Sequence, residues 1–279
     1  MEANNKKIIR DSLDKGFKSG IAGSSAMVIQ VCSLMWLRTT MNYQYRYGTS
    51  TLEALKKLYV QGGIQRFYRG ITPALLQGPL SRFGDTAANT AVIELLNSNP
   101  KTKDLNIGIK SACASFGAAL WRINLMPIDT LKTSLQVNGK KGIDILLKKY
   151  KEGGARIFYH GSLGAFGATY VGHFPWFATY NFLDEKLEPQ KEPLKKLTRN
   201  ATIGFFSSLV SDTCSNSIRV LKTQKQTYEK PISYWKCGEM IIEKEGWLGL
   251  FGRGLKTRII SNGIQGMMFS VLWKFFSQN

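Results

Sequence analysis

The sequence predicts an all-α protein made of three tandem units, each with two long helices, and two observations lead to this prediction. Six largely apolar segments are spaced along the chain, at about 20–37, 71–97, 108–131, 161–183, 198–221 and 255–276. One ten-residue phrase occurs three times, as QGGIQRFYRG, EGGARIFYHG and EGWLGLFGRG. The final glycines of the phrases, Gly70, Gly161 and Gly254, are 91 and 93 residues apart, so units of about 93 residues account for the whole chain.

The first helix of each unit ends in a basic stretch, and these stretches are SLMWLRTTMN (33–42), PIDTLKTSLQ (127–136) and SIRVLKTQKQ (217–226). In the second unit Pro127 removes one backbone hydrogen bond, which predicts a kink. Asp129 and Lys132 are three residues apart, so both side chains project from nearly the same face of the turn after the kink. Ser33 and Ser217 replace the proline in the other units and can still bend a helix by competing for backbone carbonyls.

Two segments, 20–37 and 161–183, contain 18 and 23 residues without a charge and are long enough to cross a bilayer as helices. SGIAG (19–23) and ASFGA (114–118) place small residues at close helical spacing, which lets membrane helices approach tightly. The mean hydropathy of −0.16 is low for a protein whose helices contact only lipid. It predicts helices with one face toward lipid and a second, charged face toward a water-filled cavity. A soluble protein with buried helices is the alternative.

The composition excludes several function classes. Lysine and arginine number 38 against 19 acids, and a net charge of +19 calls for an anionic partner. Because no run of five bases occurs, a nucleic-acid partner is not expected. The sequence has no Gly-rich phosphate loop and no clustered histidines, which argues against an enzyme. The four cysteines have no C-x-x-C spacing, so neither a metal nor a disulfide is expected. The first twenty residues read neither as a secretory signal nor as a good transit peptide, so targeting information is expected to be internal.

These features resemble the mitochondrial carrier family over the whole chain. The family signature is P-x-[DE]-x-x-[KR], followed about twenty to thirty residues later by an acidic-Gly phrase that ends in aromatic-basic-Gly. The second unit matches it with Pro127, Asp129, Lys132, Glu152, Gly153, Tyr159 and Gly161, and has His160 in place of the base. The resemblance implies one domain, 1–279, with repeats at approximately 10–98, 104–188 and 195–279. It also implies six transmembrane helices around a water-filled cavity, three short matrix-surface helices and a multi-pass location in the inner mitochondrial membrane.

The resemblance further implies a gate at the matrix end, in which the acid of one repeat pairs with the base of the next. The acid positions here are Met35, Asp129 and Arg219, and the base positions are Arg38, Lys132 and Lys222. Only Asp129 and Lys222 are then expected to pair, while Lys132 lacks a partner and Arg219 faces Arg38. Residues that brace the gate follow four positions after each base, at Asn42, Gln136 and Gln226.

At the cytosolic end the resemblance implies a second ring of pairs, but the corresponding positions are Thr90/Ile93, Asn181/Asp184 and Lys274/Ser277. No complementary ring is expected there. The helix N-termini at the corner glycines are expected to bind cardiolipin, because exposed backbone N–H groups and a nearby base attract anions. The residues implied in lipid binding are Arg69, Gly70, Gly161 and Gly254.

Substrate contacts are implied by the resemblance one and two turns into the second helix of each repeat, and charged or polar residues lie deeper on the same faces. The candidate substrate residues are Gln77, Arg82, Arg122, Thr169, His173, Ser261 and Asn262. Intramembrane charges are usually functional. Two alternatives stay open. Arg82 could instead pair with Asp85, and Arg122 with Asp212. His173 could be a packed, hydrogen-bonded histidine without a role in binding.

Two functions are consistent with the sequence. The first is a carrier, working as an antiporter, that moves a small anionic metabolite by alternating access. Its bases at 38, 82, 122, 132, 219 and 222 favour an anion. The second is a carrier fold without transport that serves as an accessory subunit of a larger inner-membrane complex. Alternating access requires two gates of similar strength, whereas one ion pair is expected at the matrix end and no ring of pairs at the cytosolic end. The expected partners are an anionic solute, cardiolipin and, for the second function, the other subunits; no cofactor is expected.

Overall fold

The computed structural model describes residues 2–190 and 192–278. Side chains are outside this description at 2–9, 12, 16, 18–26, 107, 266–267 and 269–278, which include the small residues of SGIAG. All regular structure in the described residues is helical. The long helices are α1 (Glu2–Tyr47), α4 (Ile71–Ser98), α5 (Ile107–Asn124), α6 (Met126–Asn138), α8 (Ser162–Lys186), α9 (Pro193–Thr227) and α11 (Leu255–Gln278). The shorter elements are α2 (Thr51–Val60), α3 (Gly63–Phe67), α7 (Lys141–Gly153), the 3₁₀ helix η1 (Gly154–Tyr159) and α10 (Tyr234–Gly252).

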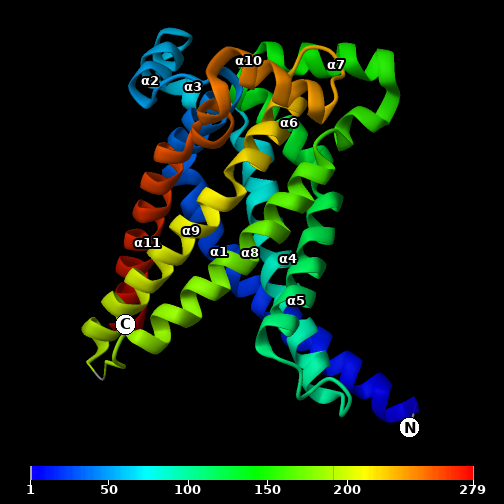
Figure 1. Ribbon diagram of the computed structural model, residues 1–279, viewed down its shortest axis with the longest axis vertical. Helices are drawn as coiled ribbons and strands as arrows, with labels where there is room; N and C mark the ends of the chain where they lie inside the picture. Colours follow the sequence, from blue (N-terminus) through cyan, green and yellow to red (C-terminus); the bar gives the residue numbers. More distant parts are fainter. Residues whose placement is uncertain (1, 191, 279) are drawn as a thin grey trace.

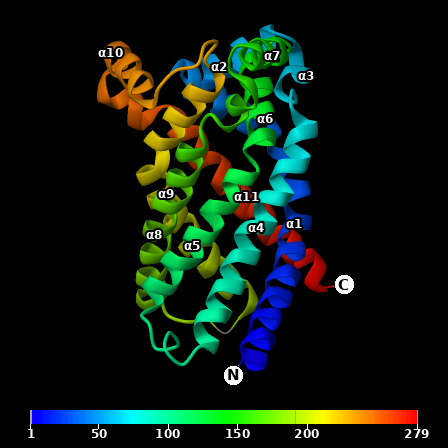
Figure 2. The same cartoon turned by 90° about the vertical axis from the view of Figure 1, so that its right-hand side faces the viewer.

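The long helices form a ring, in which each one packs against its neighbours in sequence and α11 returns to α1. The order around the ring is α1, α4, α5 with α6, α8, α9 and α11. The short helices α2, α7 and α10 lie across one end of the bundle, and both chain termini lie toward the opposite end (Figures 1 and 2). The all-α prediction is confirmed for the described residues, and the bundle has one covered end.

The kink predicted at Pro127 is confirmed. The helix α5 ends at Asn124 and α6 begins at Met126, so Pro127 occupies the first turn of a new helix, where its missing N–H costs little. In contrast, α1 and α9 continue through Ser33 and Ser217 without interruption. A serine keeps its backbone N–H, so the helical hydrogen bond at that position can still form.

The corner glycines adopt the left-handed conformation that favours glycine and begin the second helix of each repeat. Their φ angles are +83° at Gly70, +102° at Gly161 and +66° at Gly254. A Cβ added at any of them would come within 3.1 Å of the first helix of the next repeat in the ring. The nearest side chains there are Leu135 in α6, Gln226 in α9 and Tyr45 in α1. The three glycines therefore let each repeat approach the next one closely.

Three buried bases connect the repeats in the same order. Arg66 donates to the carbonyls of residues 136 and 137 at 2.8 and 2.7 Å, at the end of α6. Lys149 donates to the carbonyl of residue 226 at 3.1 Å, near the end of α9. Arg253 donates to the carbonyls of residues 45 and 46 at 3.3 Å, at the end of α1. Because the last carbonyls of a helix lack partners within it, these bases satisfy them and stabilise the covered end.

In the described part of the chain, none of the helices is both long and apolar enough to meet the hydropathy criterion for a membrane span. The expectation that 20–37 and 161–183 cross a bilayer is therefore not confirmed. The segment 161–183 has no charge, yet its glycines and its polar and proline residues lower its hydropathy.

A first prediction concerns the crossing of α4 and α5. A Cβ on Gly84 would overlap the indole of Trp121, which is held in place because its Nε1 donates to Leu80 O at 2.8 Å. We expect Gly84→Ala to lower the free energy of unfolding by about 1–3 kcal/mol through overpacking. The control is Gly204→Ala in α9, where no atom lies within 4 Å and alanine should raise it by up to about 1 kcal/mol. Equal melting temperatures of the two variants in mild detergent would contradict this packing.

A second prediction concerns Lys149, which is 1% exposed. Burial, together with the neighbouring charges of Arg46 and Lys225, lowers its pKa from 10.5 to about 8. The folded-state pKa is below the unfolded one, so the penalty of burying the charge is full below about pH 8 and is relieved as pH rises toward 10.5.

The variant Lys149→Met lacks this titration. The difference in melting temperature between the wild type and the variant should therefore grow in favour of the wild type from about pH 7 to about pH 9.5. Lys148→Met, which removes an exposed lysine from the same helix, is the control and should show a difference independent of pH. A wild-type advantage over Lys149→Met that shrinks with rising pH would contradict the assignment.

Candidate functional site: a basic cavity closed at one end

A cavity of about 570 Å³ lies inside the ring of helices and is lined by side chains from α1, α4, α5, α6, α8, α9 and α11. Two carboxylates line it, Asp85 and Asp129. Seven bases line it: Arg38, Arg82, Arg122, Lys132, Arg219, Lys222 and Arg258. Such an excess of one sign gives the cavity a positive electrostatic potential.

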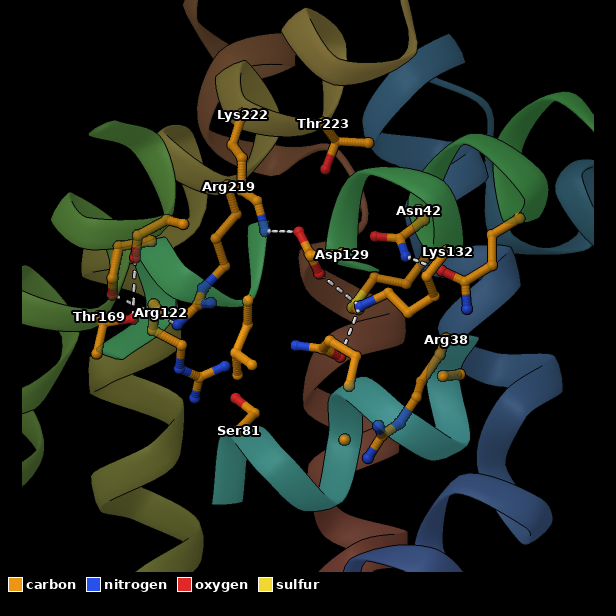
Figure 3. Close-up of a pocket in the computed structure, with 18 of the residues that line it drawn as sticks. Arg38, Asn42, Ser81, Arg122, Asp129, Lys132, Thr169, Arg219, Lys222 and Thr223 are labelled. Atoms are coloured by element: carbon orange, nitrogen blue, oxygen red, sulfur yellow. Dashed lines mark hydrogen bonds and ion pairs between the residues drawn. The ribbon is translucent and has the colours of Figure 1, made fainter. Parts of the chain in front are cut away.

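The carboxylate of Asp129 is the centre of the closed end. It is 4% exposed and pairs with two lysines, through Oδ1 with Lys132 Nζ at 2.7 Å and through Oδ2 with Lys222 Nζ at 2.6 Å. Figure 3 shows Asp129 between the ends of these two side chains. The expected pair of Asp129 and Lys222 is present. The expectation that Lys132 lacks a partner is wrong, because Asp129 lies one turn earlier on the same helix and Gln77 Oε1 accepts a further bond at 3.0 Å.

The three residues expected to brace the gate lie in the seams between the helices. Asn42 Nδ2 donates to Gln136 Oε1 at 2.6 Å and so joins α1 to α6. Gln136 Nε2 contacts Met35 Sδ at 3.4 Å. Gln226 Nε2 donates to Thr130 Oγ1 and to the Asp129 carboxylate, both at 3.1 Å, and so joins α9 to α6. The amide nitrogens of Asn42 and Gln226 thus donate across the seams, while Gln226 Oε1 is buried without a partner among the described residues.

The expectation that Arg219 faces Arg38 is wrong. Arg219 donates to Ser215 Oγ at 3.2 Å and to Ala168 O at 3.5 Å, on the side of α8. Arg38 contacts Met27 Sδ at 3.9 Å instead. Figure 3 shows the two side chains entering the cavity from different sides. Like charges repel in a site with limited water, which accounts for their separation.

Asp85 and Asp212, which were considered as partners of Arg82 and Arg122 respectively, form other ion pairs in the structure. Arg122 Nη2 pairs with Asp85 Oδ2 at 2.5 Å, and Arg258 Nε pairs with Asp212 Oδ1 at 2.6 Å. Arg82 therefore has no carboxylate within 4.0 Å among the described residues. Arg258 is a site residue that the sequence reasoning missed. The signal was available, since this arginine lies one turn after the corner glycine, inside a largely apolar segment.

The remaining candidate substrate residues divide into two groups. Those that line the cavity with the charged residues are Gln77, Thr169, Ser261 and Asn262. His173 is not among the lining residues, because its Nδ1 lies 2.8 Å from Ser115 Oγ and its ring packs edge-on against Phe177. The histidine thus joins α8 to α5.

The residues implied in lipid binding gather at the covered end of the bundle. Gly70 and Gly161 directly precede α4 and α8, and Gly254 directly precedes α11. Arg69 lies beside the first of these corners and is partly exposed. Cardiolipin binding at these positions stays a prediction.

At the opposite end, the charged residues pair on exposed surfaces. Arg199 pairs with Asp184 at 2.7 Å, and Lys15 pairs with Glu94 at 2.6 Å. The positions compared with the family's second ring were Thr90, Ile93, Asn181, Asp184, Lys274 and Ser277. The side chains of the last two are outside the described residues, and the described ones form no ring of ion pairs with one another.

A third prediction follows from the unequal burial of the two ends. Asp129→Asn removes the carboxylate from two lysines that are mostly buried, and we expect the free energy of unfolding to fall by about 3 kcal/mol or more. The control is Asp184→Asn, the same chemical change in a carboxylate that is 49% exposed, with an expected loss of at most about 1 kcal/mol. Thermal unfolding in mild detergent measures both. Similar losses in the two variants would contradict the account of the closed end.

Comparison with known proteins gives matches along the whole chain. The family model described as mitochondrial carrier protein matches three times, at residues 12–100, 103–191 and 194–278. Mitochondrial substrate carrier family protein S of Dictyostelium discoideum is 25% identical over 279 residues, covering 93% of this chain and 96% of that protein.

Two further relatives are similar. The probable mitochondrial 2-oxodicarboxylate carrier of Schizosaccharomyces pombe is 24% identical over 277 residues, covering 92% of this chain and 91% of that protein. A mitochondrial carrier-like protein of Acanthamoeba polyphaga mimivirus, L276, is 25% identical over 202 residues, covering 72% of this chain and 75% of its own. Together with the three-fold repeat and the central basic cavity, these matches identify the chain as a member of the mitochondrial carrier family.

Proposed function

We propose that the protein moves a small anion, with at least two negative charges, across the inner mitochondrial membrane by alternating access. The observation that carries this proposal is the charge balance of the cavity. Seven bases and two carboxylates line it, and among the described residues Arg38, Arg82 and Arg219 have no carboxylate within 4.0 Å. Bases without partners in an enclosed site are costly unless an anion or water compensates them. An anionic solute with two or more charges provides that compensation.

The outer surface of the bundle supports the membrane location. Large apolar side chains on α5 and α8 are not part of the cavity lining and are largely exposed, among them Phe116 (50%), Leu163 (74%), Phe174 (70%) and Phe182 (59%). Extended exposed apolar surface is unfavourable in water and suits contact with lipid tails. Membership of the carrier family supports the same location.

The difference between the two ends supports alternating access. At the covered end the seams are filled by buried residues such as Met35, Gln136 and Gln226, each at most 1% exposed. At the other end the acids of the ion pairs are more exposed, 33% at Glu94 and 49% at Asp184. A solute therefore enters from the end away from α2, α7 and α10, and its release on the covered side requires the contacts of Asp129 to separate. Binding a solute more tightly in the intermediate than in either end state drives such a change.

Dicarboxylates are the first solutes to test. One relative is named a probable 2-oxodicarboxylate carrier, and the two carboxylates of such a solute would offset part of the excess of bases in the cavity. Arginine binds carboxylates through two parallel N–H groups, so a short dicarboxylate can be held by bases from different helices.

A fourth prediction tests this function with purified protein in liposomes. We expect the uptake of a labelled 2-oxodicarboxylate to depend on an anion inside the liposomes. Arg82→Gln should lower the transport efficiency about tenfold, because one charged hydrogen bond to the solute is lost. Arg156→Gln is the control, since it makes the same change in net charge at an exposed position of η1.

Two results would contradict the proposal. One is the absence of exchange for carboxylates, phosphate and nucleotides by a folded sample, which would favour an accessory-subunit function instead. The other is transport of cations or neutral solutes in preference to anions, which the charge of the cavity does not explain.

A further inference from the structure

The three seams at the covered end are closed by different contacts. The ion pair of Asp129 and Lys222 joins α6 to α9, and the amides of Asn42 and Gln136 join α1 to α6. The gate positions of the third seam, between α9 and α1, hold two arginines that enter the cavity from different sides (Figure 3). Among the described residues, no ion pair and no direct hydrogen bond joins α9 to α1, so other contacts close this seam.

Apolar packing around Tyr45 fills part of this seam. The tyrosine is 2% exposed and lies in one cluster with Val220 of α9 and with Ile241 and Leu250 of α10. Its hydroxyl accepts a hydrogen bond from Arg258 Nη1 at 3.4 Å. Because the hydrophobic effect has no preferred direction, this packing alone does not specify which residues at the two helix ends stay together.

A directional contact lies one residue further along α1. The guanidinium carbon of Arg46 is 4.7 Å from the centroid of the Tyr228 ring, and Tyr228 directly follows the last residue of α9. The ring of Tyr47, on the same helix as Arg46, is 5.5 Å away. A cation over an aromatic face within about 6 Å is attracted by the electrons of the ring. Among the described residues, Arg46 and Tyr228 form the one cation–π contact between two repeats.

The surroundings of Arg46 hold it at this ring. Its backbone carbonyl accepts from Arg253 Nη1 at 3.3 Å, and Arg253 is itself fixed by Glu245 at 2.7 Å. The Nε of Arg46 is buried without a hydrogen-bond partner, and no carboxylate of the described residues lies within 4.0 Å of its guanidinium. Since no ion pair competes for this charge, the face of Tyr228 is its main partner across the seam.

We propose that Arg46 and Tyr228 form a latch that closes the seam between α9 and α1 at the covered end, in place of an ion pair. This contact then has to break each time the covered end opens, and the inference rests on the proposed function only for the purpose of that opening. An aromatic ring has no net charge. The latch therefore joins the two helices without placing a carboxylate beside the basic cavity.

Cys237 in α10 provides a reporter for the opening of this seam. It is buried and lies one turn before Ile241, on the face of α10 that packs against the seam. Burial raises the pKa of its thiol to about 11, so the thiol reacts slowly while the seam is closed. The experiment follows the labelling of Cys237 by a maleimide in mild detergent, after replacement of the exposed cysteines Cys32, Cys113 and Cys214 by serine. The labelling rate then reports how often the covered end opens.

We expect Tyr228→Leu and Arg46→Met to raise the labelling rate about two- to thirtyfold, because each variant removes the cation–π contact. Tyr228→Phe keeps the ring and should label at the wild-type rate. Tyr59→Leu, the same change at an exposed tyrosine of α2, is the control and should also label at the wild-type rate. The double variant of Arg46 and Tyr228 should label no faster than the faster single variant, since both changes remove the same contact.

Three results would overturn the latch. They are a labelling rate of Tyr228→Leu within twofold of the wild type, an equal rise in Tyr228→Phe or Tyr59→Leu, and effects of the two single changes that multiply in the double variant. If Arg46→Met does not fold, the comparison of Tyr228→Leu with Tyr228→Phe decides.

Solute exchange in liposomes separates this inference from the proposed function, because the labelling experiment requires no transport. Faster labelling of Tyr228→Leu but not of Tyr228→Phe, in a protein that exchanges no solute, keeps the latch and contradicts the proposed function. Exchange by the wild type, with the same labelling rate in every variant, keeps the function and contradicts the latch.

Discussion

The rest of the structure depends on one buried carboxylate held between two lysines. Asp129 accepts from Lys132 on its own helix and from Lys222 on α9, and Gln226 adds a third donor. A charged group in a buried position is stable only with such partners, so the carboxylate fixes α6 and α9 against each other. The contact from Asn42 to Gln136 then attaches α1 to the same helix. Asp129 thus closes the seam between α6 and α9, and the Asn42–Gln136 contact closes the seam between α1 and α6.

The surrounding structure reinforces this arrangement. Each corner glycine brings its repeat against the first helix of the next one, and Arg66, Lys149 and Arg253 satisfy the last carbonyls of those helices. The cavity next to the closed end is lined by seven bases and two carboxylates, which leaves it with an excess of positive charge. The protein is therefore closed by packing and by one ion-paired acid, and this excess is the property from which anion binding is inferred.

The structural features that the sequence predicted correctly are those that recur in each repeat or that depend on adjacent residues. The three-fold phrase located the glycine corners, because a left-handed turn at a fixed spacing requires the same residue each time. Pro127 located the kink, since the loss of one N–H acts where it occurs. The ion pair of Asp129 with Lys222 followed from the resemblance to carriers. These features depend on neighbouring residues or on the repeat, and both are visible in a single sequence.

What could not be predicted depends on the reach of long side chains between helices. Arg122 extends to Asp85, although the sequence suggested Asp212 as its partner, and Asp212 pairs instead with Arg258, which the sequence did not single out. Lys149 lies in an amphipathic connector and reads as a solvent-facing base, yet it is buried against the end of α9. Which acceptor such a side chain meets is decided by how the repeats pack, and no local pattern records it.

The most direct test of the central claim is a double-mutant cycle on Asp129 and Lys222. The unfolding free energies of Asp129→Asn, Lys222→Met and the double variant, measured in mild detergent, give the coupling between the two side chains. The account predicts a favourable coupling of about 1.5 kcal/mol or more, because the pair is largely excluded from water. Additive effects within about 0.5 kcal/mol would contradict it, since the closed end would then not depend on this carboxylate.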